Sequence, residues 1–144
     1  MARDYITVYL AGACEHVPDW RKDAMAAFYK IAKYDELKAC VINPSDYDQQ
    51  NQTDRQIKSF LFSKIRQSDV MLVNLNYSSK CIGLAQEIQH AVDQYVPIVA
   101  YGRIDVHPWL ANVDCDVVFN TLEEAIEYIR DYYMASSVPI GVGA

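Results

Sequence analysis

The feature that most limits how this chain can fold is a near-continuous apolar run at residues 70–75, interrupted only by Asn74. Such runs are typical of strands buried on both faces, which occur in parallel sheets covered by helices. The segment 78–88 follows it and enters an amphipathic helix that carries Glu87. Glu87 therefore falls near the start of a helix, just past the carboxyl end of a central strand. Ligands bind at that place in open α/β sheets.

Short apolar runs alternate with helical patterns along the whole sequence. We expect strands at 6–10, 40–42, 70–75, 97–101 and 117–119, with helices between them and a final helix ending near residue 134. This alternation predicts one flavodoxin-like or Rossmann-like α/β domain: a five-stranded parallel sheet in the order 2-1-3-4-5 with helices on both faces. The ends of the first and third strands then flank a crevice, which brings together Tyr9, Gly12, Ala13, Asn76, Ser79, Gly83 and Glu87.

Local patterns set the limits of several helices. Thr53 with Gln56, and Thr121 with Glu124, are spaced as capping boxes at helix starts. In the helix after the third strand we expect one apolar face, and most of the stretch 102–115 is predicted to be loop. The members of that apolar face are Leu84, Ala85, Ile88, Ala91, Val92 and Tyr95.

The length and charge of the chain limit its class and its partners. A chain of 144 residues is long enough for one domain, which we place at 1–135, followed by a tail at 136–144. Its formal net charge of −6 argues against nucleic-acid polymers and anionic membranes as partners. Small nucleotides stay possible, since a helix N-terminus can hold a phosphate. No run approaches the ~20 apolar residues of a membrane-spanning helix.

Cysteine and histidine spacing gives no sign of a metal or redox site. The chain's 4 cysteines form no CxxC pair, which favours reduced, mostly buried thiols in a cytoplasmic protein. His16, His90 and His107 have no metal-ligand spacing. We therefore expect neither a metal nor a cofactor.

The position of Glu87 on its predicted helix suits chemistry on a small molecule. Successive helical residues rotate by about 100°, so Glu87 lies beside the apolar face and is expected to be half-buried. Gly83, one turn earlier, leaves an open slot. Burial would raise the pKa of Glu87, whereas the nearby helix N-terminus would favour the anion. A carboxylate facing a slot is a suitable nucleophile or cation stabiliser; the alternative is a helix glutamate paired with solvent or lysine.

Several short motifs occur in a set order over nearly the whole chain. They are Tyr9-Leu10-Ala11-Gly12, Asn43-Pro44, 68–73, 79–91 with Gly83 and Glu87, Pro97-Ile98-Val99, His107-Pro108-Trp109-Leu110 and 121–126. Together they resemble the nucleoside 2-deoxyribosyltransferase family and its relatives that hydrolyse nucleotide N-glycosidic bonds.

The resemblance implies roles for two of these residues. Glu87 would be the nucleophile that attacks C1′ of the sugar, releases the base and leaves a glycosyl-enzyme ester. A second base or water would then take the sugar, following the logic of a retaining glycosidase. Tyr9 would hydrogen-bond to Glu87 and orient it, although a core position for this aromatic ring also fits the strand alternation.

The sequence departs from the family pattern at two positions. Leu61 stands where members often carry an aspartate that serves the leaving base. Asp46 or Asp48, in the loop after Asn43-Pro44, could act as the acid instead; the alternative for each is a solvated loop aspartate. Cys81 stands where relatives place an aspartate or a serine that contacts sugar or phosphate. Cysteine hydrogen-bonds weakly to a hydroxyl, so Ser78 or Ser79 are alternatives.

Further residues are expected to bind substrate or a neighbouring subunit. Trp20 and Arg21 would stack on a base and contact a phosphate, or else form an ordinary first helical turn with Trp20 packed on a loop. Asn43, which follows the second strand, is also expected to bind substrate. Oligomers of the family often complete each site from a neighbour, for which Asn112 and the tail are candidates. The 11 tyrosines, three of them on the last helix, also favour a homo-oligomer.

The resemblance implies cleavage or transfer at the N-glycosidic bond of a nucleoside or nucleotide. Residues 76–81 followed by Glu87 loosely resemble a TIR-like NAD glycohydrolase, which is one alternative. A non-catalytic nucleotide-binding module is another, favoured by Leu61 and Cys81.

Overall fold

The computed structural model describes residues 5–12, 20–47, 50–78, 81–103 and 109–135. Five parallel strands form a sheet in the order β2-β1-β3-β4-β5, so the predicted fold class and strand order are confirmed. The strands are β1 (Tyr5–Gly12), β2 (Lys38–Ile42), β3 (Val70–Asn74), β4 (Ile98–Tyr101) and β5 (Val117–Phe119).

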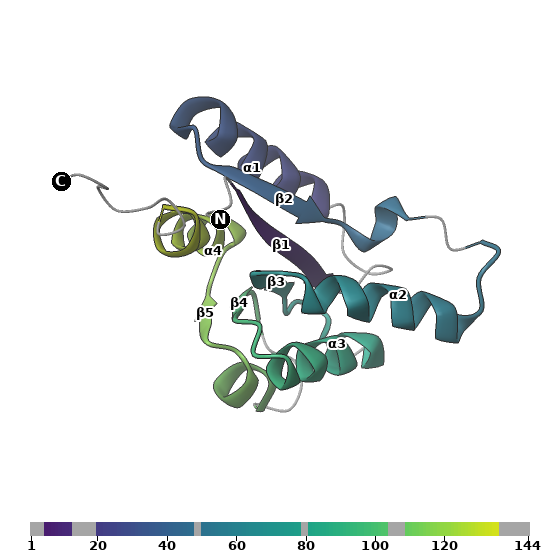
Figure 1. Cartoon of the computed structure of the whole chain (residues 1–144). Helices are drawn as coiled ribbons and strands as arrows, with labels where there is room; N and C mark the ends of the chain where they lie inside the picture. The colour runs from purple at the N-terminus through teal and green to yellow at the C-terminus, as the bar shows by residue number, and fades with distance from the viewer. Residues whose placement is uncertain (1–4, 13–19, 48–49, 79–80, 104–108, 136–144) are drawn as a thin grey trace.

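Helices connect the strands and cover both faces of the sheet (Figure 1). The α-helices are α1 (Trp20–Asp35), α2 (Asp54–Arg66), α3 (Ile82–Asp93) and α4 (Leu122–Tyr128). A short 3₁₀ segment, η1 (Pro44–Asp46), follows β2, and two π-helical segments, η3 (Leu110–Asp114) and η4 (Ile129–Met134), lie near the C-terminus.

Side-chain alternation along β1 divides the core into two layers. Val8 and Leu10 are fully buried against α1 and α4. Tyr9 and Ala11 are fully buried on the opposite face, against α2 and α3. Strands paired on both sides and covered on both faces are expected to be apolar at nearly every position, which explains the near-continuous apolar runs in the sequence.

The two predicted capping patterns both start helices. At α2 the Thr53 hydroxyl accepts from the Gln56 amide at 3.1 Å, and the Gln56 side chain accepts from the Thr53 amide at 2.8 Å. At α4 the Thr121 hydroxyl accepts from the Glu124 amide at 3.2 Å but donates to the Glu124 carboxylate at 3.0 Å. The second pattern is therefore a cap without the reciprocal bond.

Three local predictions were wrong. Val92 and Tyr95 do not belong to the buried face of α3, because they are 38% and 94% exposed. Tyr95 lies beyond the end of the helix at Asp93 and has a left-handed φ of 58°. The predicted loop contains η3. Of the free thiols in the described residues, Cys40 is exposed on edge strand β2 and only Cys115 is buried.

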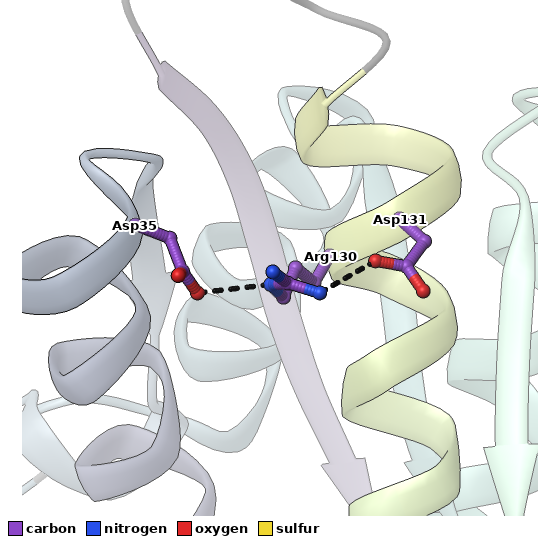
Figure 2. A network of polar contacts seen from close by, with 3 residues as sticks. All are labelled: Asp35, Arg130 and Asp131. Atoms are coloured by element: carbon purple, nitrogen blue, oxygen red, sulfur yellow. Dashed lines mark hydrogen bonds and ion pairs between the residues drawn. The ribbon is translucent and has the colours of Figure 1, made fainter.

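The last helical segment is joined to the end of α1 by Arg130 (Figure 2). Its Nε lies 2.9 Å from Asp35 Oδ2, and its Nη1 lies 2.8 Å from Asp131 Oδ1. The pair with Asp35 joins η4 to α1, whereas the pair with Asp131 lies within η4. Exposed ion pairs contribute little to stability. Within the described residues no helix is both long and apolar enough to span a bilayer.

Candidate active site

The carboxyl ends of the three central strands lie side by side. Gly12 of β1 pairs in register with Asn74 of β3, which in turn pairs with Tyr101 of β4. Asn74 is 1% exposed, and its Oδ1 accepts from the Asn76 amide at 2.9 Å. Burial raises the pKa of Tyr101 well above its usual value, so this phenol stays neutral.

A short hydrogen bond links β1 to α3 beside this edge. The Tyr9 hydroxyl donates to Glu87 Oε2 at 2.6 Å, a length typical of bonds to a charged acceptor. Tyr9 is fully buried, and Glu87 is half-buried on the flank of α3 next to the buried residues Leu84 and Ile88. The contact that the resemblance implied between Tyr9 and Glu87 is thus present.

The surroundings of Glu87 place two opposing influences on its carboxyl group. Burial raises the pKa of Glu87 and is the largest effect, because a carboxylate loses solvation there. The hydrogen bond from Tyr9 and the positive charge of Arg21 both lower the pKa, without cancelling the effect of burial. A weakly solvated carboxylate held by one oriented donor is suited to nucleophilic attack.

Trp20 and Arg21 begin α1 against the end of β1. Arg21 Nη2 donates to the Gly12 carbonyl at 2.9 Å, and its Cζ lies 4.8 Å from the centroid of the Trp20 ring. The Trp20 ring packs edge-on to Tyr101 at 6.0 Å and is 5% exposed. In this structure the Trp20 ring is therefore a core residue that packs on Tyr101 of β4 rather than on a loop, whereas Arg21 brings a charge to the strand end.

Two other predicted binding residues are engaged in loop structure. The Asn43 side chain accepts from the Ser45 amide at 3.0 Å and caps η1. Asn76 Oδ1 accepts from the Arg103 amide at 2.9 Å and ties the loop after β3 to the loop after β4. Asp46, the predicted acid, is exposed in η1. None of these three side chains contacts Tyr9 or Glu87 through a hydrogen bond within the described residues.

The remaining predicted residues lie at the start of α3 or away from it. Cys81 precedes α3 and is half-buried, but its side chain does not cap the helix. Gly83 is exposed, and a Cβ added there would meet nothing within 4 Å. Asn112 is exposed on η3. Ala13 and Ser79 lie outside the described residues, as do Asp48, His107 and the tail.

Two buried polar residues of this edge were not predicted to belong to the site. Tyr101 and Asn74 lie opposite each other in register at the ends of β4 and β3. The sequence marks Asn74 as unusual, because it is the polar residue in the apolar run 70–75. Tyr101 has no such mark, because an aromatic residue is ordinary in a strand. Among the described residues, no three histidine, cysteine, aspartate or glutamate side chains gather as metal ligands would.

Three solved structures are similar to this chain along nearly its whole length. A conserved protein from Enterococcus faecalis V583 matches with a TM-score of 0.64 and 18% identity, covering 88% of this chain and 98% of its own. The 2-deoxyribosyltransferase of Leishmania mexicana matches with a TM-score of 0.62 and 18% identity, covering 89% and 99%. That of Bacillus psychrosaccharolyticus has a TM-score of 0.59 and 15% identity, covering 91% and 95%.

The chain has the 2-deoxyribosyltransferase fold. No protein-family model and no curated protein matches its sequence. In this deoxyribosyltransferase fold Tyr9 lies three residues before the end of β1, opposite Met71 of β3. It holds Glu87 of α3, the helix that follows the carboxyl end of β3, and open α/β sheets bind ligands at that edge.

Proposed function

We propose that the protein cleaves the N-glycosidic bond of a nucleoside, deoxynucleoside or nucleotide through Glu87 and passes the sugar to water or to a second base. The observation that carries this proposal is the 2.6 Å hydrogen bond from Tyr9 of β1 to Glu87 of α3, the helix that follows the carboxyl end of β3. The deoxyribosyltransferase fold of the chain supports it.

In the proposed reaction Glu87 is the nucleophile. Tyr9 holds Oε2, and Oε1 has no hydrogen-bond partner among the described residues. Oε1 forms a bond to C1′ of the sugar while the bond from C1′ to the base nitrogen breaks, and the electron pair leaves with the base. Water or a second base then attacks C1′ and releases the carboxylate, so that the anomeric configuration is retained.

The departing base needs a proton, and Asp46 is proposed as its donor. Asp46 is exposed in η1, which directly follows β2 at the carboxyl edge of the sheet. The helix that carries Glu87 follows β3 at the same edge, so a substrate bound there would lie between η1 and α3. Asp46→Asn should slow release of bases that need protonation, without preventing formation of the glycosyl-enzyme ester from activated substrates.

Base release from a substrate panel tests the proposal. Deoxynucleosides, ribonucleosides, their 5′-monophosphates and NAD are incubated with the protein, and free base is measured by chromatography. Glu87→Gln should abolish release. Tyr9→Phe should reduce it by about 10- to 100-fold, since a hydrogen bond to a charged group contributes about 1.5–3 kcal/mol. Glu36→Gln, an exposed glutamate after α1, is the control and should be unaffected.

The proposal also predicts a sugar adduct on Glu87, visible as a mass increase of the intact protein and absent from Glu87→Gln. Failure to release base from any compound would contradict an enzymatic role. Release that persists in Glu87→Gln would exclude Glu87 as nucleophile. Release from NAD alone would instead indicate a glycohydrolase of the TIR-like class.

A further inference from the structure

Helix α2 concentrates positive charge in a chain that is acidic overall. The formal net charge of the chain is −6, yet this one helix carries four of the 13 lysines and arginines and a single acidic residue, Asp54. The four cations are Arg55, Lys58, Lys64 and Arg66. Arg55 and Lys58 lie one turn apart, where like charges repel each other and destabilise a helix. The sequence therefore keeps a charged surface here that does not help the helix to form.

Three of these cations line a groove that follows the helix. Its volume is about 670 Å³. The groove is lined by Asp54, Arg55, Lys58, Ser59, Phe62 and Arg66. Apart from Phe62, which is half-buried, all of these residues are exposed. At about 1.5 Å per residue the lining extends about 18 Å along the helix axis, so the groove is elongated and its charges are spread along it.

The cations of this groove have no anionic partner within the described residues. In that part of the chain both ion pairs belong to Arg130, and the cationic side chains of the groove make no hydrogen bond. Asp54 stands four residues before Lys58, a spacing at which an acid and a base can pair on a helix. The Lys58 ammonium group instead lies 5.2 Å from the centroid of the Phe62 ring. One carboxylate against three cations leaves a positive excess for an anion from outside the chain.

Phe62 gives the groove a fixed floor. Its ring stacks on His90 of α3, with the two ring centroids 4.5 Å apart and an angle of 24° between the planes. The ammonium group of Lys58 is attracted to the face of the same ring. A cation that is already positioned in this way loses less conformational freedom when it binds an anion. The groove is thus partly organised for binding.

We infer that the groove along α2 binds an extended polyphosphate chain. The guanidinium groups of Arg55 and Arg66, the Lys58 ammonium group and the Ser59 hydroxyl are donors, which phosphate oxygens require. Arg66 lies eight residues beyond Lys58, or about 12 Å along the axis, so a single phosphate contacts only one end of the groove, whereas a chain of phosphates contacts both. Glu87 does not line the groove, so this site is independent of the proposed function.

Calorimetric titration with orthophosphate, tripolyphosphate and a longer inorganic polyphosphate tests the site. Removing both Arg55 and Lys58 by substitution with Gln should weaken binding of the longer chain and of tripolyphosphate by about tenfold, since an exposed ion pair contributes up to about 1 kcal/mol. Arg66→Gln should weaken binding of the longer chain by about threefold and leave tripolyphosphate unchanged. The control replaces Lys30 and Lys33, two exposed lysines of α1, with Gln and changes the net charge equally. It should bind like the wild type.

The replaced side chains are exposed, and Gln has nearly the helix propensity of Lys and Arg, so these variants should keep α2 folded, which circular dichroism checks. Failure of the wild type to bind the longer chain would overturn the inference. An equal loss in the α1 control would show that only the net charge matters. Equal losses for both chain lengths in Arg66→Gln would exclude an extended ligand. Tighter binding of a polyglutamate peptide or of a single-stranded oligonucleotide than of polyphosphate would assign the groove to that partner instead.

Discussion

Glu87→Gln is expected to make the protein more stable at neutral pH while removing its proposed activity. The reason is the environment of the carboxyl group, where burial outweighs Tyr9 and Arg21 and raises the pKa above its ordinary value of 4.5. Above that raised pKa the folded chain must hold a charge in a poorly solvated position. A neutral amide of the same shape removes this cost and can still accept the hydrogen bond from Tyr9.

The sign and size of the effect follow from proton linkage. Between 4.5 and the raised pKa, the folded chain binds a proton that the unfolded chain has lost, so the free energy of unfolding falls as pH rises. The contribution of Glu87 is fully present below pH 4.5 and is lost above its folded pKa. A tenfold difference between the proton affinities of the folded and unfolded chain corresponds to about 1.4 kcal/mol. Because the amide forms a weaker hydrogen bond than the carboxylate, we expect a net gain of about 1 kcal/mol at pH 8.

Thermal unfolding followed by circular dichroism at pH 4 and pH 8 measures this gain. For a chain of this size about 1 kcal/mol raises Tm by about 2–4 °C. Glu87→Gln should show that increase at pH 8 and almost none at pH 4. Glu36→Gln, on an exposed residue, should show no pH-dependent offset. An offset that is equal at both pH values, or a lower Tm at pH 8, would refute the reasoning about the buried charge.

Two further predictions concern packing and thiol chemistry. Gly12→Ala should destabilise the protein by about 1–3 kcal/mol, because the new Cβ would lie 3.0 Å from the Trp20 ring. Gly83→Ala should stabilise it by about 0.5 kcal/mol, because its Cβ meets nothing within 4 Å and alanine favours the helix. Urea unfolding measures the free energy of unfolding of both variants, and equal effects would contradict these predictions. Burial and two adjacent aspartates raise the pKa of Cys115 to about 12. Iodoacetamide at pH 8 should therefore alkylate the exposed thiol of Cys40 long before that of Cys115, which peptide mass mapping measures. Equal alkylation rates at the two cysteines would contradict this prediction.

The sheet could be predicted from the sequence because its central strands are buried on both faces. That burial leaves apolar runs such as 70–75, and the helical patterns between them require parallel pairing. The errors fell where local geometry overrides periodicity. The apolar pattern of α3 continues to Tyr95, but the left-handed backbone at that residue turns its side chain into solvent. The π-helical η3 has no period that a strand or α-helix pattern would detect.

Parts of the candidate site were predictable for a different reason. The position of Glu87 beside the apolar face of a helix already indicates that it is half-buried. Its contact with Tyr9 joins residues 78 positions apart, so it became an expectation only through strand order and the family resemblance. Asn43 and Asn76 show the limit of this approach. A polar residue after a strand suits both substrate binding and loop capping, and only the folded structure shows that these two amides hold loops here.

β1 connects the stability of the protein to the chemistry proposed for it. Tyr9, which donates to Glu87, is fully buried, and the Gly12 carbonyl, which holds Arg21, belongs to the same strand. β1 pairs with β2 on one side and β3 on the other, so neither contact can shift without disturbing the centre of the sheet. The opposing influences on Glu87 are therefore fixed by core packing. Core substitutions in β1 should consequently alter the titration of Glu87 as well as the stability of the fold.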